Sequence, residues 1–119
     1  MRVAIPRMGE MVAPCFEYCA TMAIYTIAGS DVVEQVDFPL RSRDPFDRVR
    51  LLRDQAVDTL ICGGMRDRFE DVLRTTGFEV ISWVSGPVED LLDMYLHGRL
   101  APGADHSGAG SATRRDTGP

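Results

Sequence analysis

The stretch Asp58-Thr59-Leu60-Ile61-Cys62-Gly63-Gly64 decides the fold, because it joins a short apolar strand to a tight turn. A helix pattern precedes it, and Asp44 and Pro45 open that helix as N-cap and first-turn proline. A second helix pattern follows over residues 68–75 and ends before Gly77. Strands that alternate with helices pair in parallel through right-handed crossovers. The stretch therefore predicts an α/β domain.

The strands on either side of this unit complete the predicted sheet. Residues 2–6, 22–27 and 32–38 are rich in β-branched and aromatic residues, and residues 29–31 provide the turn of an antiparallel hairpin. Residues 78–84 indicate a further strand, and residues 88–97 indicate a helix with an apolar stripe. We predict a mixed five-stranded sheet with helices packed on it. As a residue of the last strand, Trp83 is expected in the core.

Length, charge and composition limit the kind of protein. The 119 residues, 45% of them hydrophobic, are enough for one domain with its own core, and the formal net charge of −5 disfavours nucleic acid as a partner. No signal-peptide pattern and no membrane-spanning stretch is present, so we expect a cytoplasmic protein with no membrane partner. From Pro102 onward the sequence lacks aromatic and branched aliphatic residues. We therefore predict a domain over residues 1–101 and a disordered tail over residues 102–119.

Three cysteines fall where a strand pattern gives way to a turn or a helix, which is where α/β folds collect their ligands. Cys15 and Cys19 lie in a turn that also carries proline, glutamate and tyrosine, a composition that does not indicate a core. Cys62 ends an apolar run, so it is either a small buried hydrophobe or a ligand. In a reducing compartment, such cysteines are better interpreted as thiols or metal ligands than as disulfides.

The turn Gly63-Gly64 has two interpretations. Backbone N–H groups at the start of a helix attract anions, and Arg66 would add positive charge, so Gly63, Gly64 and Arg66 are candidate cofactor-binding residues. The alternative is a tight turn from strand to helix, which glycine serves routinely. An anionic metal–sulfur cluster would fit a site that combines thiolates, N–H groups and arginine.

Five motifs, in order and spacing, resemble the dinitrogenase iron-molybdenum cofactor biosynthesis family, which includes NifX, NafY and the C-terminal domain of NifB. They are MRVAIP at 1–6, VAPCF at 12–16, AVDTLICGG at 56–64, GFEV at 77–80, and VED at 88–90 with YLHGRL at 95–100. The resemblance covers residues 1 to about 100. It implies a ribonuclease H-like α/β fold and a protein that binds or carries iron–molybdenum cofactor or its iron–sulfur precursor.

The sequence departs from the family pattern at three places. Cys15 stands where the family usually has histidine, and a thiolate in place of imidazole favours softer metals. Residues 65–70 replace the glycine-rich segment that usually follows Cys-Gly-Gly, and the histidine–glycine stretch common before the first helix is absent from residues 39–47. The identity of the cofactor therefore does not follow from the resemblance.

These observations lead to one functional hypothesis and one alternative. We expect a small non-catalytic carrier that holds an iron–sulfur or mixed-metal cluster through Cys15, Cys19 and Cys62, with a cofactor-assembly or acceptor protein as its partner. Three ligands leave one position open for transfer, and two thiolates from each protomer of a homodimer would equally give four sulfur ligands. The alternative is a metal-free regulatory or interaction module with redox-responsive thiols. A nuclease is disfavoured, because no spaced set of carboxylates lies on successive strands.

Overall fold

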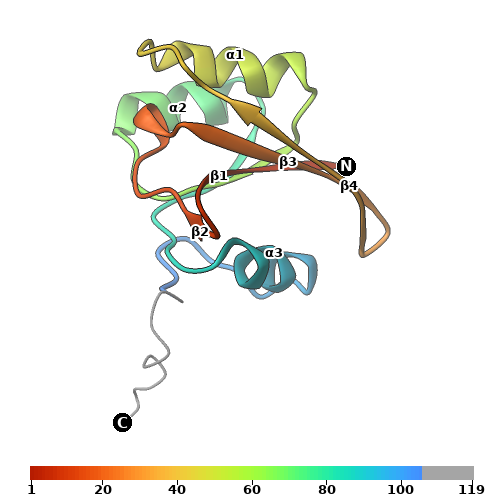
Figure 1. Ribbon diagram of the computed structural model, residues 1–119. Coiled ribbons are helices and arrows are strands. Elements are labelled where there is room, and N and C mark those ends of the chain that lie inside the picture. Colours follow the sequence, from red (N-terminus) through yellow and green to blue (C-terminus); the bar gives the residue numbers. More distant parts are fainter. Residues whose placement is uncertain (106–119) are drawn as a thin grey trace, which may run out of the picture.

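A mixed sheet forms the middle layer of the computed structural model, which describes residues 1–105 (Figure 1). Its five main strands run in the order β4-β3-β1-β5-β6, with β5 parallel to both β1 and β6, and β3 antiparallel to both β1 and β4. Their bounds are β1 Arg2–Met8, β3 Thr21–Ala28, β4 Asp31–Pro39, β5 Thr59–Ile61 and β6 Glu79–Ile81. The predicted mixed sheet is confirmed. A two-residue strand that was not predicted, β2 (Met11–Val12), pairs with β1 as a sixth strand.

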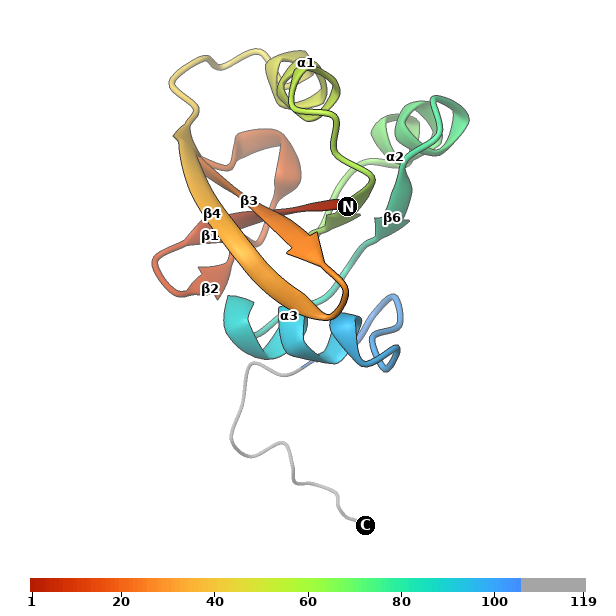
Figure 2. The same ribbon diagram turned by 90° about the vertical axis from the view of Figure 1, so that its right-hand side faces the viewer.

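Helices cover both faces of this sheet, as the two views in Figures 1 and 2 show. The helices are α1 (Phe46–Asp54), α2 (Asp67–Thr75) and α3 (Val88–Leu96). Neighbouring residues of the central strand β1 serve two separate cores: Ala4 belongs with Leu52 of α1, whereas Ile5 belongs with Leu91 of α3. Because both faces are covered, the central strands are almost wholly apolar, as is usual for strands in this setting.

The start of α1 follows the predicted pattern. Asp44 Oδ1 accepts a hydrogen bond from Phe46 N at 3.0 Å, and Pro45 has the φ of −60° that a helix start requires. The helix buries Val49 and Leu52, which face the sheet. This segment brings the next strand, β5, back to the middle of the sheet beside β1.

The last strand is shorter than predicted, and the expectation that Trp83 lies in the core is wrong. β6 ends at Ile81, and Trp83 has a φ of 62° and is 62% exposed. Its N–H donates to Gly63 O at 2.9 Å, so the backbone of Trp83 remains beside the turn that follows β5. The left-handed backbone at Trp83 breaks the alternation of the strand, which accounts for an indole that lies at the surface.

The first residues of the predicted tail, residues 102–105, contact the domain. Gly103 N donates to Ser82 O at 3.0 Å, and Ser85 N donates to Ala104 O at 3.0 Å. These backbone hydrogen bonds attach residues 102–105 to the segment after β6, so the segment is ordered without large apolar side chains of its own. The remainder of the predicted tail, residues 106–119, lies outside the described part of the chain.

Candidate functional site

The turn that carries Cys15 lies against the turn that follows β5. Phe16 N donates to Gly64 O at 2.9 Å, and Gly64 N donates to Pro14 O at 2.8 Å, so the backbones on either side of Cys15 are fixed to Gly64. Cys62 directly follows β5, at the carboxyl end of a strand in the middle of the sheet. The Cys15 turn and this end of β5 therefore lie side by side.

Gly63 makes this close approach possible. A Cβ atom at Gly63 would lie 2.5 Å from Ala13 O and 2.8 Å from Pro14 O, and both oxygens belong to the backbone of the Cys15 turn. No side chain fits there unless the two turns separate. Gly63 therefore has a packing role. This role fits the interpretation of Gly63-Gly64 as a tight turn rather than as an anion site.

A buried carboxylate locks the Cys15 turn to the start of α2. Glu17 lies in the 3-10 helix η1 (Phe16–Tyr18), and its side chain is 2% exposed. Arg66 N donates to Glu17 Oε1 at 2.8 Å, and Arg66 Nε lies 3.3 Å from Glu17 Oε2. The N–H and guanidinium that were predicted to bind a cofactor anion thus hold a carboxylate of the chain itself. The N–H of Gly64 is engaged as well, by Pro14.

The three cysteines occupy different environments. Cys15 is partly exposed, whereas Cys19 is 4% exposed and Cys62 is fully buried in the core beneath α1 and α2. Cys15 and Cys19 line one cavity of about 420 Å³, together with Arg7, Met8 and Tyr18, and Cys62 does not line it. Within residues 1–105, no group of three His, Cys, Asp or Glu residues is placed to hold a metal ion. Cys15 and Cys19 thus share a cavity, whereas Cys62 belongs to the buried core.

Burial controls the charge of the two inner thiols. Burial raises the pKa of the Cys19 thiol, and the neighbouring Arg48 guanidinium opposes this rise without cancelling it. Burial also raises the pKa of the Cys62 thiol, to which the nearby Glu70 carboxylate adds. Both inner cysteines are therefore neutral thiols at neutral pH in this structure.

Arg48 is a buried cation directly behind Cys19. It is 3% exposed, and its Nη2 donates to Cys19 O at 2.7 Å while its Nη1 donates to Ser42 O at 2.6 Å. Its Nε is buried and has no hydrogen-bond partner within the described residues. A positive charge thus lies close to Cys19, where it would favour the thiolate form that a metal requires.

Two exposed aromatic residues flank Cys15 on its outer side. Cys15 lines a groove of about 650 Å³ with Pro14, Tyr18, Gly64, Met65 and Trp83, among others. Tyr18 is 64% exposed and Trp83 is 62% exposed, and the Trp83 ring passes so close to Gly64 that a Cβ there would lie 2.9 Å from Cζ3. Neither aromatic residue was predicted as part of the site. Trp83 matched the strand predicted over residues 78–84, and the sequence carries no signal that this strand ends at Ile81.

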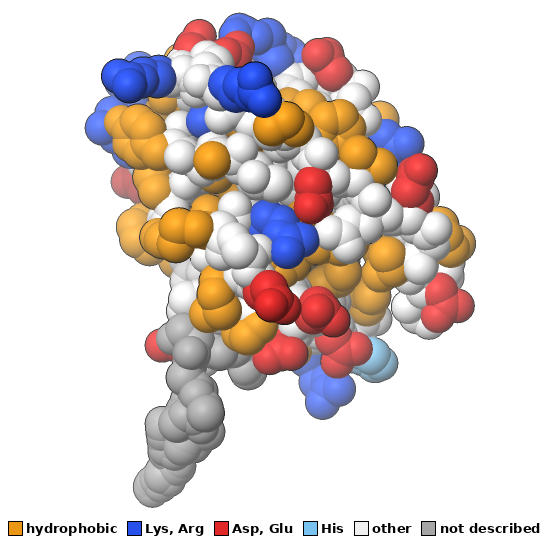
Figure 3. Space-filling view, viewed as in Figure 1, with side chains coloured by type: hydrophobic (Ala, Val, Ile, Leu, Met, Phe, Trp, Pro, Cys, Tyr) orange, Lys and Arg blue, Asp and Glu red, His pale blue; other side chains and the backbone are white. Residues whose placement is uncertain are grey.

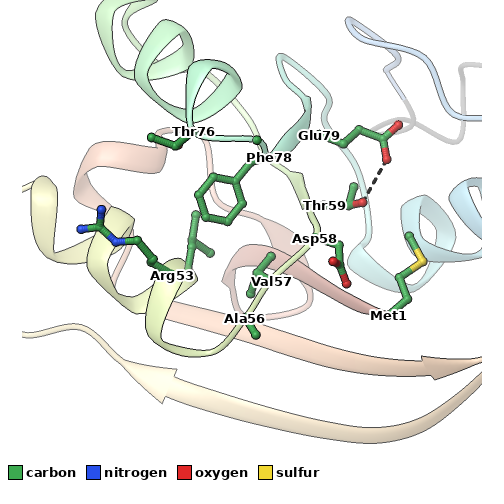
Figure 4. Close-up of a pocket in the computed structure, with 11 residues that line it drawn as sticks. Met1, Arg53, Ala56, Val57, Asp58, Thr59, Thr76, Phe78 and Glu79 are labelled. Atoms are coloured by element: carbon green, nitrogen blue, oxygen red, sulfur yellow. Dashed lines mark hydrogen bonds between the residues drawn. The ribbon is translucent and has the colours of Figure 1, made fainter.

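A larger cavity, about 750 Å³, lies at the other end of the parallel strands and contains no thiol (Figure 4). Its lining includes Asp58, Thr59 and Glu79, where β5 and β6 begin, and Phe78 and Arg53. Thr59 Oγ1 donates to Glu79 Oε1 at 2.9 Å, and Tyr95 donates to the same oxygen. Glu79 is thus engaged by Thr59 and Tyr95, and the cavity shares no lining residue with the two cavities beside Cys15.

No helix within residues 1–105 has the length and apolar character that crossing a bilayer requires.

The fold and the site together define a small α/β domain with a thiol-bearing groove at the carboxyl end of its central parallel strand. The chain belongs to the dinitrogenase iron-molybdenum cofactor family, whose model matches residues 1–98. The resemblance deduced from the five motifs is confirmed.

Solved structures share the fold of this chain. The crystal structure of PH0822 superposes with a TM-score of 0.79 at 22% identity, covering 86% of this chain and 94% of that one. A candidate NifB protein from Thermotoga gives a TM-score of 0.62 at 28% identity, covering 85% and 91% of the two chains. The apo form of the orange protein from Desulfovibrio gigas gives 0.70 at 17% identity, covering 85% and 91%, a likeness of fold alone. No curated protein matches the sequence.

Proposed function

We propose that this chain is a non-catalytic carrier that binds an iron–sulfur or mixed-metal cluster as cargo at the groove beside Cys15. The observation that carries the proposal is the position of Cys15: a partly exposed thiol on a rigid turn, at the carboxyl end of the central parallel strand, in a chain of a cofactor family. Ligands of open α/β sheets bind at that end. A thiolate is also the donor that iron in clusters and other soft metals prefer.

The donor set fits such a cargo in part. Cys15 is the first ligand, because it is the most accessible of the three thiols and its backbone is held on both sides by Gly64. Cys19 is the second ligand, since it lines the same cavity and has the Arg48 cation behind it. Cys62 was expected as a third ligand, but it is fully buried and lines neither of the two cavities beside Cys15, so we assign it to the core.

The groove walls suit a compact cluster. Trp83, Tyr18 and Met65 offer apolar and polarisable surface, and Arg66 places a positive charge at the rim. No part of this site provides a general base aligned with a nucleophile, which supports binding rather than catalysis within the described residues. A cofactor-assembly or acceptor protein would then be the partner that supplies or receives the cargo.

The single tryptophan of the chain makes the proposal testable. Anaerobically purified protein should be coloured and contain iron or another metal, and cluster reconstitution should quench the fluorescence of Trp83, because Trp83 and Cys15 line the same groove. Bound metal without any change in Trp83 emission would place the cargo elsewhere. A colourless protein that takes up no metal on anaerobic reconstitution would overturn the proposed function.

One observation supports the alternative function, a metal-free module with redox-responsive thiols. Cys15 and Cys19 are both free thiols, they flank the short helix η1, and they line the same cavity. Oxidation of this pair would break the two S–H bonds and form one S–S bond, and the two protons and two electrons would pass to an oxidant such as a small-molecule disulfide, which is reduced to two thiols. A mass decrease of about 2 Da under mild oxidation, mapped to a Cys15–Cys19 linkage in a protein that binds no cluster, would favour this function.

A further inference from the structure

The ligand set of one protomer is too small for a cluster that depends on protein thiolates. Protein-bound iron–sulfur clusters are held by four cysteine thiolates or their equivalents. Of the three thiols, Cys62 is buried in the core, so only Cys15 and Cys19 share the cavity at the site. Among residues 1–105, no further His, Asp or Glu completes a group of three. The described residues thus offer two sulfur ligands at this site, and a site with four sulfur ligands would take the other two from a second chain.

The surface around Cys15 has the character of an interface rather than of a free surface. Three large apolar side chains surround it and are well exposed: Met8 at 63%, Tyr18 at 64% and Trp83 at 62%. Met8 and Tyr18 line the inner cavity beside Cys15, and Tyr18 and Trp83 line the outer groove. We call Met8, Cys15, Tyr18 and Trp83 the Cys15 face. Exposed apolar side chains that gather in one place usually mark a surface that another molecule covers.

The charges at the edge of this face are complementary to themselves. Arg66 and Asp67 both line the groove and are both exposed. Arg66 pairs with Glu17 through Nε, but its side chain is 65% exposed, and Asp67 forms no ion pair with any described residue. In a two-fold dimer, every contact between two different residues occurs twice, once from each protomer. Asp67 of each protomer can therefore face Arg66 of the other. The face over α3 lacks this property, because Glu89, Asp90 and Asp93 make it acidic (Figure 3). A second copy would be repelled there.

We propose that a second copy of this chain docks on the Cys15 face and that Cys15 and Cys19 of both protomers hold one shared cluster. The inference rests on the proposed function, since the cargo supplies the bond between the two protomers. Four thiolates then surround the cluster, and the exposed aromatic residues of the two protomers exclude water from it. Without cargo, the Cys15 face is small and the protein is monomeric.

The experiment measures mass and metal content on the same anaerobic sample. Sedimentation or native mass spectrometry of the full chain, before and after reconstitution with ferrous iron and sulfide, should show a monomer that becomes a dimer with one cluster for two chains. A monomer that retains a full cluster overturns the shared site and leaves the proposed function intact. Absence of bound metal overturns both. A dimer that forms equally in the Cys15→Ser protein overturns the bridging role of the cargo.

A pair of surface variants tests the face itself. Trp83→Asn removes the indole, and asparagine tolerates the positive φ at this position, so the fold is retained. The dimer fraction at equal protein concentration should fall at least several-fold. Val33→Thr, at a 60% exposed position on the edge strand β4, is the matched control and should leave the dimer unchanged. Equal loss in both variants, or loss in neither, contradicts the assignment of the interface to the Cys15 face.

Discussion

The carboxylate of Glu17 accepts a hydrogen bond from the backbone N of Arg66 at 2.8 Å and lies 3.3 Å from the Nε of the same residue. Residues 49 positions apart are thus joined at two points, with the carboxylate buried and the guanidinium largely exposed. The contact fixes the turn that carries Cys15 to the start of α2. The turn that presents the thiol is therefore held in place by a contact within the chain itself.

Removing this carboxylate should loosen the Cys15 turn. We expect Glu17→Ala to lower the free energy of unfolding by about 1.5–3 kcal/mol, because a buried hydrogen bond to a charged group is lost. Glu17→Gln retains the acceptor for Arg66 N and should lose less. Chemical denaturation of the three proteins measures this order, and a Glu17→Ala protein as stable as wild type would show that the contact contributes nothing.

Gly63 should tolerate no side chain. Gly63→Ala would place a Cβ within 2.5 Å of Ala13 O, a backbone atom that cannot move without the turn. We expect a loss of about 1–3 kcal/mol in stability, the usual cost of forcing extra atoms into a packed region. Gly64→Ala is the matched comparison, since its nearest contact is the far end of the Trp83 side chain, which can swing away. Thermal melts of the two variants should differ clearly, and equal melting temperatures would contradict the close approach.

Stability should fall as the pH rises above 9. Burial raises the pKa values of Cys19 and Cys62 above the ordinary thiol value of 9.0, so the folded state keeps protons that the unfolded state releases. The stabilising contribution is complete below pH 9 and declines as the pH climbs toward the folded-state pKa values. Urea denaturation between pH 8 and 10 tests this. The Cys62→Ala protein should show a shallower decline, and a wild-type profile that is flat over this range would contradict the burial of the two thiols.

Truncation at two positions should show whether residues 101–105 stabilise the fold. A chain that ends at Leu100 loses two backbone hydrogen bonds, which Gly103 N donates to Ser82 O and Ser85 N donates to Ala104 O. We expect it to be less stable by about 1 kcal/mol for each bond lost. A chain that ends at Asp105 keeps both bonds and serves as the control. If the two truncated proteins melt at the same temperature, residues 101–105 do not stabilise the fold.

The order of strands and helices could be predicted from local sequence because each signal acts locally. Asp44 and Pro45 open α1, and the apolar run before Cys62 forms β5 as expected. Trp83 could not be predicted in the same way. A single positive φ reverses the side on which its ring lies, and apolar periodicity carries no signal for that reversal.

The candidate site shows the same division. The neighbourhood of Cys15, Gly63 and Gly64 follows from the rule that turns meet at the carboxyl ends of parallel strands. That Arg66 is engaged by Glu17 depends on a contact between distant segments, which no local pattern encodes. The burial of Cys62 was left open by the sequence, since an apolar run fits both a core residue and a ligand.

Metal content of three anaerobic proteins tests the central claim most directly. Wild type, Cys15→Ser and Cys15→His are prepared side by side and analysed for metals, with thermal melts as a check on folding. We expect metal in wild type and none in Cys15→Ser at a stability within about 1 kcal/mol, because Cys15 is partly exposed and acts as a ligand. Cys15→His should keep some metal with a shifted preference, since imidazole is the harder donor. Equal metal in wild type and in Cys15→Ser would remove Cys15 from the site and contradict the account.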